Sequence, residues 1–169
     1  KKSMDAARET DKTLTKNATK VERTSERELV TTRTINGPAR LVYQAWSKAE
    51  LFGRWWVPES FRLTLVSCEM DVRVGGTYRL VFRHGDSEPM AFYGKYLEVV
   101  ADSRIVWTNE EGEGEGPITT VTFEENAGKT LVVLHERYPS KEALDAAMES
   151  GEKSCMDETF DQLDGLLAT

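Results

Sequence analysis

The chain has 169 residues, a length that fits one domain burying roughly 70% of the surface that its unfolded chain exposes. Its 22 basic and 29 acidic residues give a net charge of -7 without a conspicuous basic cluster, which argues against nucleic acid and anionic membranes as partners. Cys68 and Cys155 fit neither a disulfide framework nor a CxxC zinc pattern, and no apolar run approaches the ~20 residues of a membrane span, so we expect a cytoplasmic protein without membrane insertion.

Residues 1–25 are polar and carry few large apolar side chains. This composition predicts a tail or a loosely docked arm, and it lacks the apolar stretch of a signal peptide. We expect a single domain over residues 26–169. Its first element is "ELVTTRTI", residues 28–35, because a β-branched, threonine-rich run is typical of a strand.

Two short helices are predicted directly after this strand. Gly37 fits the N-cap of the first helix and Pro38 its first helical position, and apolar residues then recur with helical spacing. The second helix, residues 51–56, repeats the spacing and ends before Pro58. The buried faces of the two helices carry three of the four tryptophans: Trp46, Trp55 and Trp56.

Six more strands are expected between residues 61 and 138, which gives seven in all, and Gly75–Gly76 marks a bend or bulge between two of them. Alternation makes one face of the sheet aromatic and the other polar. The run Leu131–Leu134 is apolar throughout and assigns no face. The large side chains of the aromatic face are Tyr78, Leu80, Phe82, Phe92, Tyr96 and Trp107.

The C-terminal part returns to helical spacing. Ser140 is the expected N-cap of one helix, which Gly151 interrupts. The last helix carries an apolar stripe at i, i+4, i+7 and i+11, and the aromatic sheet face is the surface available to cover it. The predicted fold class is therefore α+β, with a seven-stranded antiparallel sheet packed on a long C-terminal helix. The stripe consists of Met156, Phe160, Leu163 and Leu167.

Motifs for catalysis or metal binding are not found. His84 and His135 lack metal-ligand spacing, the acidic stretch "NEEGEGEGP" does not match an EF-hand loop, and no GxSxG or phosphate loop occurs. Glu69, Asp71 and Arg73 share a strand face, where they form either a polar ligand contact or a surface charge ladder. We therefore expect no cofactor, no metal and no catalytic residue.

Several segments together resemble a known family. These are "RTINGPARLVYQAWSKAELFGRWW", "DVRVGGTYRLVF", "GKYLEVV" and "TFDQLDGLL", and the resemblance covers residues 28–168. They are similar to the bacterial homologues of the activator of the heat-shock-protein-ninety ATPase (AHSA-like proteins). That family lies in the START, or birch-pollen-allergen-like (SRPBCC), superfamily of helix-grip folds. Cys155–Met156 stands where the family commonly has Gly-Trp.

The resemblance implies a curved sheet wrapped around the C-terminal helix, with a hydrophobic cavity between them. In the superfamily this cavity commonly holds an apolar small molecule such as a lipid or polyketide. For the three clustered tryptophans, core packing remains the alternative to ligand contact, because buried aromatic side chains usually form core. The residues expected to bind the ligand are Trp46, Trp55, Trp56, Tyr78, Phe82, Phe92, Tyr96, Trp107, Met156 and Phe160.

Three functional classes follow from the resemblance. A binding protein for an apolar or amphipathic small molecule ranks first, because the implied cavity has an aromatic lining. A cyclase-like or hydrolase-like enzyme would need an acid–base pair in the cavity, and none is legible in the sequence. A co-chaperone in the stress response, in contact with a heat-shock ATPase, ranks last. We expect a monomer or a weak homodimer.

Overall fold

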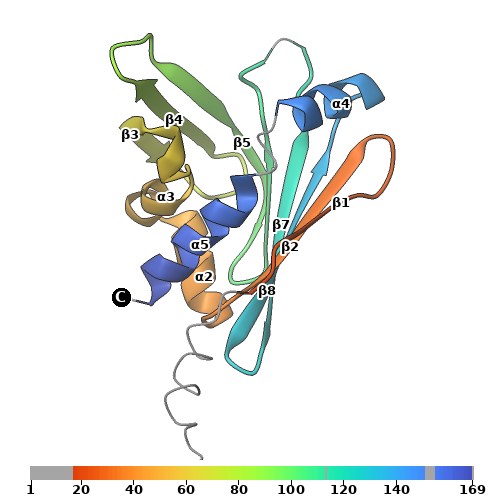
Figure 1. The fold of residues 1–169 in the computed structure, drawn as a ribbon. Coiled ribbons are helices and arrows are strands. Elements are labelled where there is room, and N and C mark those ends of the chain that lie inside the picture. The colour runs from red at the N-terminus through yellow and green to blue at the C-terminus, as the bar shows by residue number, and fades with distance from the viewer. Residues whose placement is uncertain (1–16, 113, 151–154, 169) are drawn as a thin grey trace, which may run out of the picture.

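The computed structural model describes residues 17–112, 114–150 and 155–168. Within these ranges eight strands form one antiparallel sheet in the order β1-β2-β8-β7-β6-β5-β4-β3 (Figure 1). None of the described helices is long and apolar enough to cross a membrane. The strands are β1 (Lys20–Arg23), β2 (Glu28–Ile35), β3 (Leu63–Met70), β4 (Thr77–His84), β5 (Met90–Val100), β6 (Arg104–Thr108), β7 (Ile118–Asn126) and β8 (Lys129–Arg137).

Three α-helices, α2, α3 and α5, lie on one face of the curved sheet, and α4 lies beside β1 (Figure 1). Helix α5 contacts β2 as well as α2 and α3, so the C-terminal helix is held between the sheet and the two short helices. This α+β, helix-grip arrangement confirms the predicted fold class. The helices are α2 (Ala39–Ser47), α3 (Ala49–Trp55), the 3-10 turn η1 (Glu59–Phe61), α4 (Lys141–Glu149) and α5 (Met156–Leu167).

The sheet has one strand more than the seven predicted, because β1 pairs with β2 at the sheet edge. All four side chains of β1 are exposed, so the segment shows no apolar alternation that could reveal a strand. Arg23 of β1 also forms an ion pair with Asp145 of α4 at 2.8 Å. Part of the expected polar arm is thus docked on the sheet, whereas residues 1–16 lie outside the described residues.

The helix starts differ in how well the sequence predicted them. Ser140 is the N-cap of α4 as expected, and its hydroxyl accepts a hydrogen bond from the Ala143 N–H. Helix α2 instead begins one residue late, with extended Pro38 as its N-cap. A side chain from β7 satisfies this start, because Glu125 accepts a hydrogen bond from the Ala39 N–H at 3.0 Å. The expected break at Gly151 lies outside the described residues.

Helix α5 is fixed on the sheet by both an apolar and an ionic contact. Its apolar stripe includes Phe160 and Leu163, which are fully buried. Beside the stripe, Arg33 of β2 is 1% exposed, and its guanidinium contacts a row of carboxylates on α5. Because these carboxylates recur at helical spacing, one arginine can set the register of the whole helix. They are Asp157, Asp161 and Asp164, at 3.4, 2.8 and 2.8 Å.

Two details of the sheet decide which side chains face the helices. In β8 the alternation that the sequence left open resolves, with Val132 and Leu134 buried and Leu131 exposed. Between β3 and β4, Gly75 adopts a φ of +86°, and a Cβ on Gly76 would lie 2.0 Å from the Asp71 carbonyl oxygen. The glycine pair therefore marks a tight bend, as expected, and β4 turns back with its aromatic residues facing the helices.

Candidate functional site

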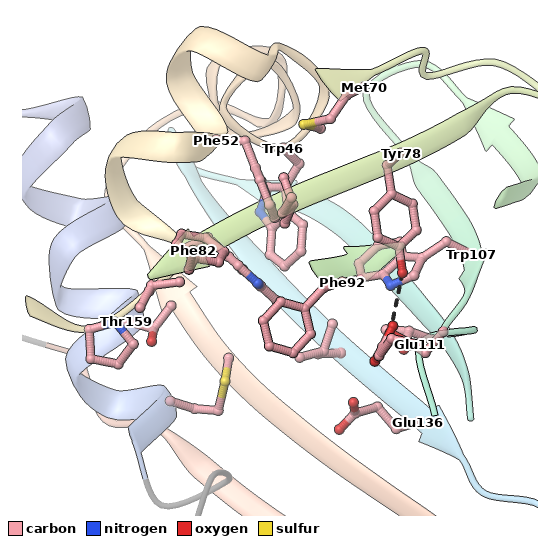
Figure 2. A pocket seen from close by; sticks show the side chains of 18 of the residues that line it. Trp46, Phe52, Met70, Tyr78, Phe82, Phe92, Trp107, Glu111, Glu136 and Thr159 are labelled. Atoms are coloured by element: carbon pink, nitrogen blue, oxygen red, sulfur yellow. Dashed lines mark hydrogen bonds between the residues drawn. The ribbon is translucent and has the colours of Figure 1, made fainter. Parts of the chain in front are cut away.

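A pocket of about 270 Å³ is lined by residues of both the sheet and the helices (Figure 2). Strands β4, β5 and β6 supply most of its aromatic wall, β7 and β8 supply the adjoining wall, and α2 and α3 close one end. The beginning of α5 borders the pocket through Met156 and Thr159. The inward-facing side chains of the sheet and the apolar faces of the helices thus line the same pocket.

Most of the residues expected at a cavity do line this pocket. They are Trp46, Trp56, Tyr78, Phe82, Phe92, Tyr96, Trp107 and Met156. The structure places Trp55 and Phe160 outside the lining, because both are fully buried beneath it, with their rings stacked at 6.5 Å. These two side chains belong to the core.

The closed end of the pocket is a cluster of interlocked rings: Trp46, Phe52, Trp55 and Trp56 together with Phe160. Trp46 meets Trp55 edge-on with ring centres 4.8 Å apart, and Phe52 stacks on Trp56 at 4.9 Å. The Trp55 indole donates a hydrogen bond to the Ala45 carbonyl oxygen at 2.9 Å. The Trp46 indole N–H is buried without a hydrogen-bond partner among the described residues. Core packing therefore accounts for Trp55, while Trp46 and Trp56 both pack in the cluster and line the pocket.

The open end of the pocket, formed by Tyr78, Phe92, Glu111 and Glu136, is built differently. The Tyr78 hydroxyl donates a hydrogen bond to the Thr108 carbonyl oxygen at 2.7 Å. Gly94 of β5 makes this contact possible, because a Cβ there would lie 2.1 Å from the same oxygen. Gly94 is also the β5 partner of Tyr78 in the sheet, so the phenol ring crosses the strand where no side chain obstructs it.

Burial raises the pKa of Tyr78 well above its ordinary value, and the negative charge of Glu111 adds to that shift. Burial likewise raises the pKa of Tyr96, which lies 5.7 Å from Tyr78 between ring centres. Both phenols are therefore neutral at physiological pH. They serve the pocket as apolar rings with a hydroxyl group rather than as acids or nucleophiles.

Sequence reasoning missed the polar residues of the lining: Asn109, Glu111, Thr119, Glu136 and Thr159. Glu136 is 7% exposed and continues the inward alternation of Val132 and Leu134 along β8. Once the face of β8 is known, this period-two spacing identifies Glu136 as inward-facing. Glu111 follows β6 in the acidic stretch, and no periodic pattern marks it. Figure 2 shows both glutamates below Tyr78 and Trp107 in that view.

The family model of the Activator of Hsp90 ATPase homolog 1-like protein matches residues 36–168. This chain belongs to that family. Solved structures share the fold of this domain. A protein from Rhodobacter sphaeroides superposes with a TM-score of 0.81 at 19% identity, and the match covers 89% of this chain and 98% of that chain. A comparison with curated proteins gave no match.

Two further structures extend the likeness. A protein from Staphylococcus epidermidis, 26% identical, gives a TM-score of 0.75 over 88% of this chain and 93% of that one. A protein from Mycobacterium smegmatis, 22% identical, gives 0.76 over 89% of this chain and 98% of that one. At these identities the likeness supports the fold of the family domain.

Other candidate residues in this family domain lie away from the pocket. Asp71 and Arg73 form an exposed ion pair at 2.8 Å, which fits a surface charge ladder. His135 lies 2.9 Å from Glu28, and this hydrogen bond lowers the pKa of the glutamate. Among the described residues, no group of three or more His, Cys, Asp or Glu side chains could hold a metal ion.

Proposed function

We propose that this family member binds an apolar or amphipathic small molecule in the pocket described above. The observation that carries the proposal is the contrast within the lining. Aromatic side chains pack against one another at the closed end, yet a space of about 270 Å³ remains between the sheet and the start of α5. Protein interiors rarely leave apolar surface unfilled at this scale, so a ligand is the simplest occupant.

The size of the pocket favours a compact ligand. Small-molecule sites typically measure ~300–1,000 Å³, and this pocket lies just below the lower limit of that range. One or two fused rings fit such a space better than an extended acyl chain does. The half-exposed Phe92, at the open end, supplies a point of entry.

Native mass spectrometry of the purified protein tests the proposal. We expect a small molecule that remains bound under native conditions and is released on unfolding. Phe92→Ala should reduce its occupancy, because Phe92 lines the pocket. Tyr93→Ala is the matched control, since Tyr93 is the next residue on β5, is similarly exposed and is not part of the lining. Equal occupancy in both variants, or no ligand binding from any compound panel, would contradict the proposal.

The family description names an activator of the Hsp90 ATPase, so co-chaperone activity is the second candidate. We propose that it is not the main role of this chain, because the pocket is a ready site for a small molecule. At micromolar concentration the protein should leave the ATPase rate of a bacterial Hsp90 unchanged. A several-fold rise in that rate would reverse the ranking of the two functions.

A further inference from the structure

We propose that the ligand is a neutral ring compound with a carbonyl oxygen, and that this oxygen accepts a hydrogen bond from the tryptophan indoles of the pocket lining. This inference rests on the proposed function, because it specifies the chemistry of a ligand in the same pocket. Three properties of the described lining support it: indole N–H groups without an acceptor, the absence of a cationic side chain, and the aromatic rings around the space.

Tryptophans on and off the lining differ in their hydrogen bonds. Trp55, which lies beneath the lining, donates its indole N–H to the Ala45 carbonyl oxygen at 2.9 Å. Trp46 lines the pocket and is 2% exposed, yet its N–H has no acceptor among the described residues. Trp56 and Trp107 also line the pocket, and neither indole donates a hydrogen bond to another described residue. The indole away from the pocket is thus satisfied by the chain, and the three that border it are not.

A buried donor without an acceptor is uncommon. The large majority of buried side-chain polar atoms in folded proteins have a hydrogen-bond partner, and an unsatisfied one lowers stability because it has lost its bonds to water. The three lining indoles are neighbours, since the ring of Trp46 is centred 5.4 Å from that of Trp56 and 5.9 Å from that of Trp107. Side chains of a binding site commonly adjust on binding, so the Trp46 N–H can turn toward the space that its ring already borders. An acceptor on the ligand then supplies what the protein does not.

Other polar features of the lining narrow the chemistry of that acceptor. The Tyr78 hydroxyl and the Asn109 amide already donate to the carbonyl oxygens of Thr108 and Pro117. None of the described lining residues is lysine, arginine or histidine. A carboxylate or phosphate would therefore lose its hydration without gaining a countercharge. A carbonyl oxygen offers two lone pairs and no net charge, so it suits indole donors in this lining.

The aromatic part of the lining favours a ring as the body of the ligand. Figure 2 shows Trp46, Phe92 and Trp107 bordering one space. Flat rings pack against such side chains by offset stacking or by edge contacts. In about 270 Å³, one or two fused rings fill the space and leave the carbonyl oxygen to meet an indole.

Two neutral probes of the same shape test the inference: acetylnaphthalene, and isopropenylnaphthalene, in which a methylene group replaces the carbonyl oxygen. Their affinities for the full chain are measured by displacement of the neutral dye phenylnaphthylamine. We expect the ketone to bind about fivefold more tightly than the alkene, because only the ketone accepts a hydrogen bond. Naphthoate should bind most weakly, since the described lining has no cation to offset its charge.

Single Trp→Phe variants identify the donor. Trp46→Phe, Trp56→Phe and Trp107→Phe each remove one N–H from the lining, and the ratio of the two affinities within one variant cancels the loss of ring area. We expect this ratio to fall most in Trp46→Phe, to about one. Trp55→Phe is the matched control, because it removes an indole outside the lining and should keep the ratio. A ratio that survives in all three lining variants, or that falls as far in Trp55→Phe, would overturn the inference.

The unsubstituted chain provides a second measurement that depends on no variant. Nitrogen–proton correlation spectra give one indole signal for each of the four tryptophans. The indole proton of a donor in the lining should move further downfield with the ketone than with the alkene, because hydrogen bonding deshields it while the ring currents of the two probes are alike. Equal shifts with both probes would contradict a hydrogen bond from the lining.

The outcomes separate this inference from the proposed function. If the alkene binds as tightly as the ketone, the carbonyl preference is wrong and small-molecule binding stands. If naphthoate binds most tightly, the neutral charge is wrong and small-molecule binding again stands. If none of the three probes binds at its solubility limit and no small molecule co-purifies, both proposals fail together.

Discussion

The closed end and the open end of the pocket both contain aromatic side chains, but these side chains pack differently. At the closed end, two consecutive short helices bring Trp46 and Trp55 to 4.8 Å between ring centres. At the open end, Tyr78 and Phe92 stand on neighbouring strands whose spacing is fixed by backbone hydrogen bonds. Helices can shift until their side chains interlock, whereas strands of one curved sheet cannot close on each other. The sheet side of the layer therefore keeps its space.

The largest effect that follows from this contrast concerns Phe160 and Phe92. Phe160→Ala should lower the free energy of unfolding by about 3–5 kcal/mol, because its ring is fully buried under the closed end. Phe92→Ala should cost only about 1 kcal/mol, because the ring is 36% exposed and its loss enlarges an existing space. Urea unfolding measures both variants. Similar losses would show that the two ends are packed alike.

The elements that form the two ends could largely be predicted from the sequence. The apolar stripe of α5 could be predicted because Phe160 and its apolar neighbours recur at helical spacing. The aromatic face could be predicted because large apolar and polar residues alternate along β4. The packing density of the two ends could not, since it depends on how far strands and helices can approach. Strand β1 could not be predicted either, because it pairs through backbone hydrogen bonds and has no apolar pattern.

Polar residues of the open end show the same limit. Glu136 has the spacing of an inward residue, but the uniformly apolar run before it hides which face is inward. The burial of Arg33 is a further case. It depends on three carboxylates of α5, which lie far from Arg33 in the sequence, so no local pattern predicts it. Tertiary neighbours, rather than local patterns, determine the role of both residues.

Alkaline pH should lower the free energy of unfolding of the protein. Because burial raises the pKa of Tyr78 and Tyr96, the folded state retains their protons above about pH 10, where the unfolded chain releases them. Stability is thus full below that pH and falls by up to about 1.4 kcal/mol per pH unit for each tyrosine above it.

Urea unfolding at about pH 9 and about pH 11 measures this loss. Tyr78→Phe should make the protein less sensitive to the change in pH, because one of the groups with a raised pKa is removed. The hydrogen bond lost from Tyr78 lowers stability at both pH values and leaves the difference between them unaffected. An unchanged pH dependence in this variant would show that Tyr78 ionises as readily in the folded protein as in the unfolded chain.

A smaller effect separates two tryptophans of the closed end. Trp55→Phe removes the hydrogen bond to the Ala45 carbonyl oxygen, whereas the Trp46 N–H has no hydrogen-bond partner among the described residues. Both changes remove similar apolar area, so Trp55→Phe should cost about 1 kcal/mol more than Trp46→Phe. Thermal unfolding of the two variants tests the difference. A larger cost for Trp46→Phe would mean that its N–H has an acceptor in the folded protein.

The smallest effect changes fluorescence with little change in stability. Trp107 borders the open space, and Trp46 and Trp56 form its end wall, so an apolar ligand should perturb the emission of these three indoles. Trp55 is shielded beneath them and should contribute little to the change. Single Trp→Phe variants titrated with a fluorescent apolar probe separate the contributions, and Trp55→Phe is the control that retains the full response.

Stability distinguishes true occupancy from adsorption in the same titration. A ligand that binds the native state adds RT ln(1 + [L]/Kd) to the unfolding free energy, about 2.7 kcal/mol at 100 times its Kd. Quenching that is accompanied by this gain in stability, and that is partly lost in Trp107→Phe, places the probe in the pocket. Quenching without it indicates binding to exposed apolar residues such as Val66 and Leu97, which are not part of the pocket lining. A response carried equally by Trp55 and Trp107 would contradict the distinction between a closed and an open end.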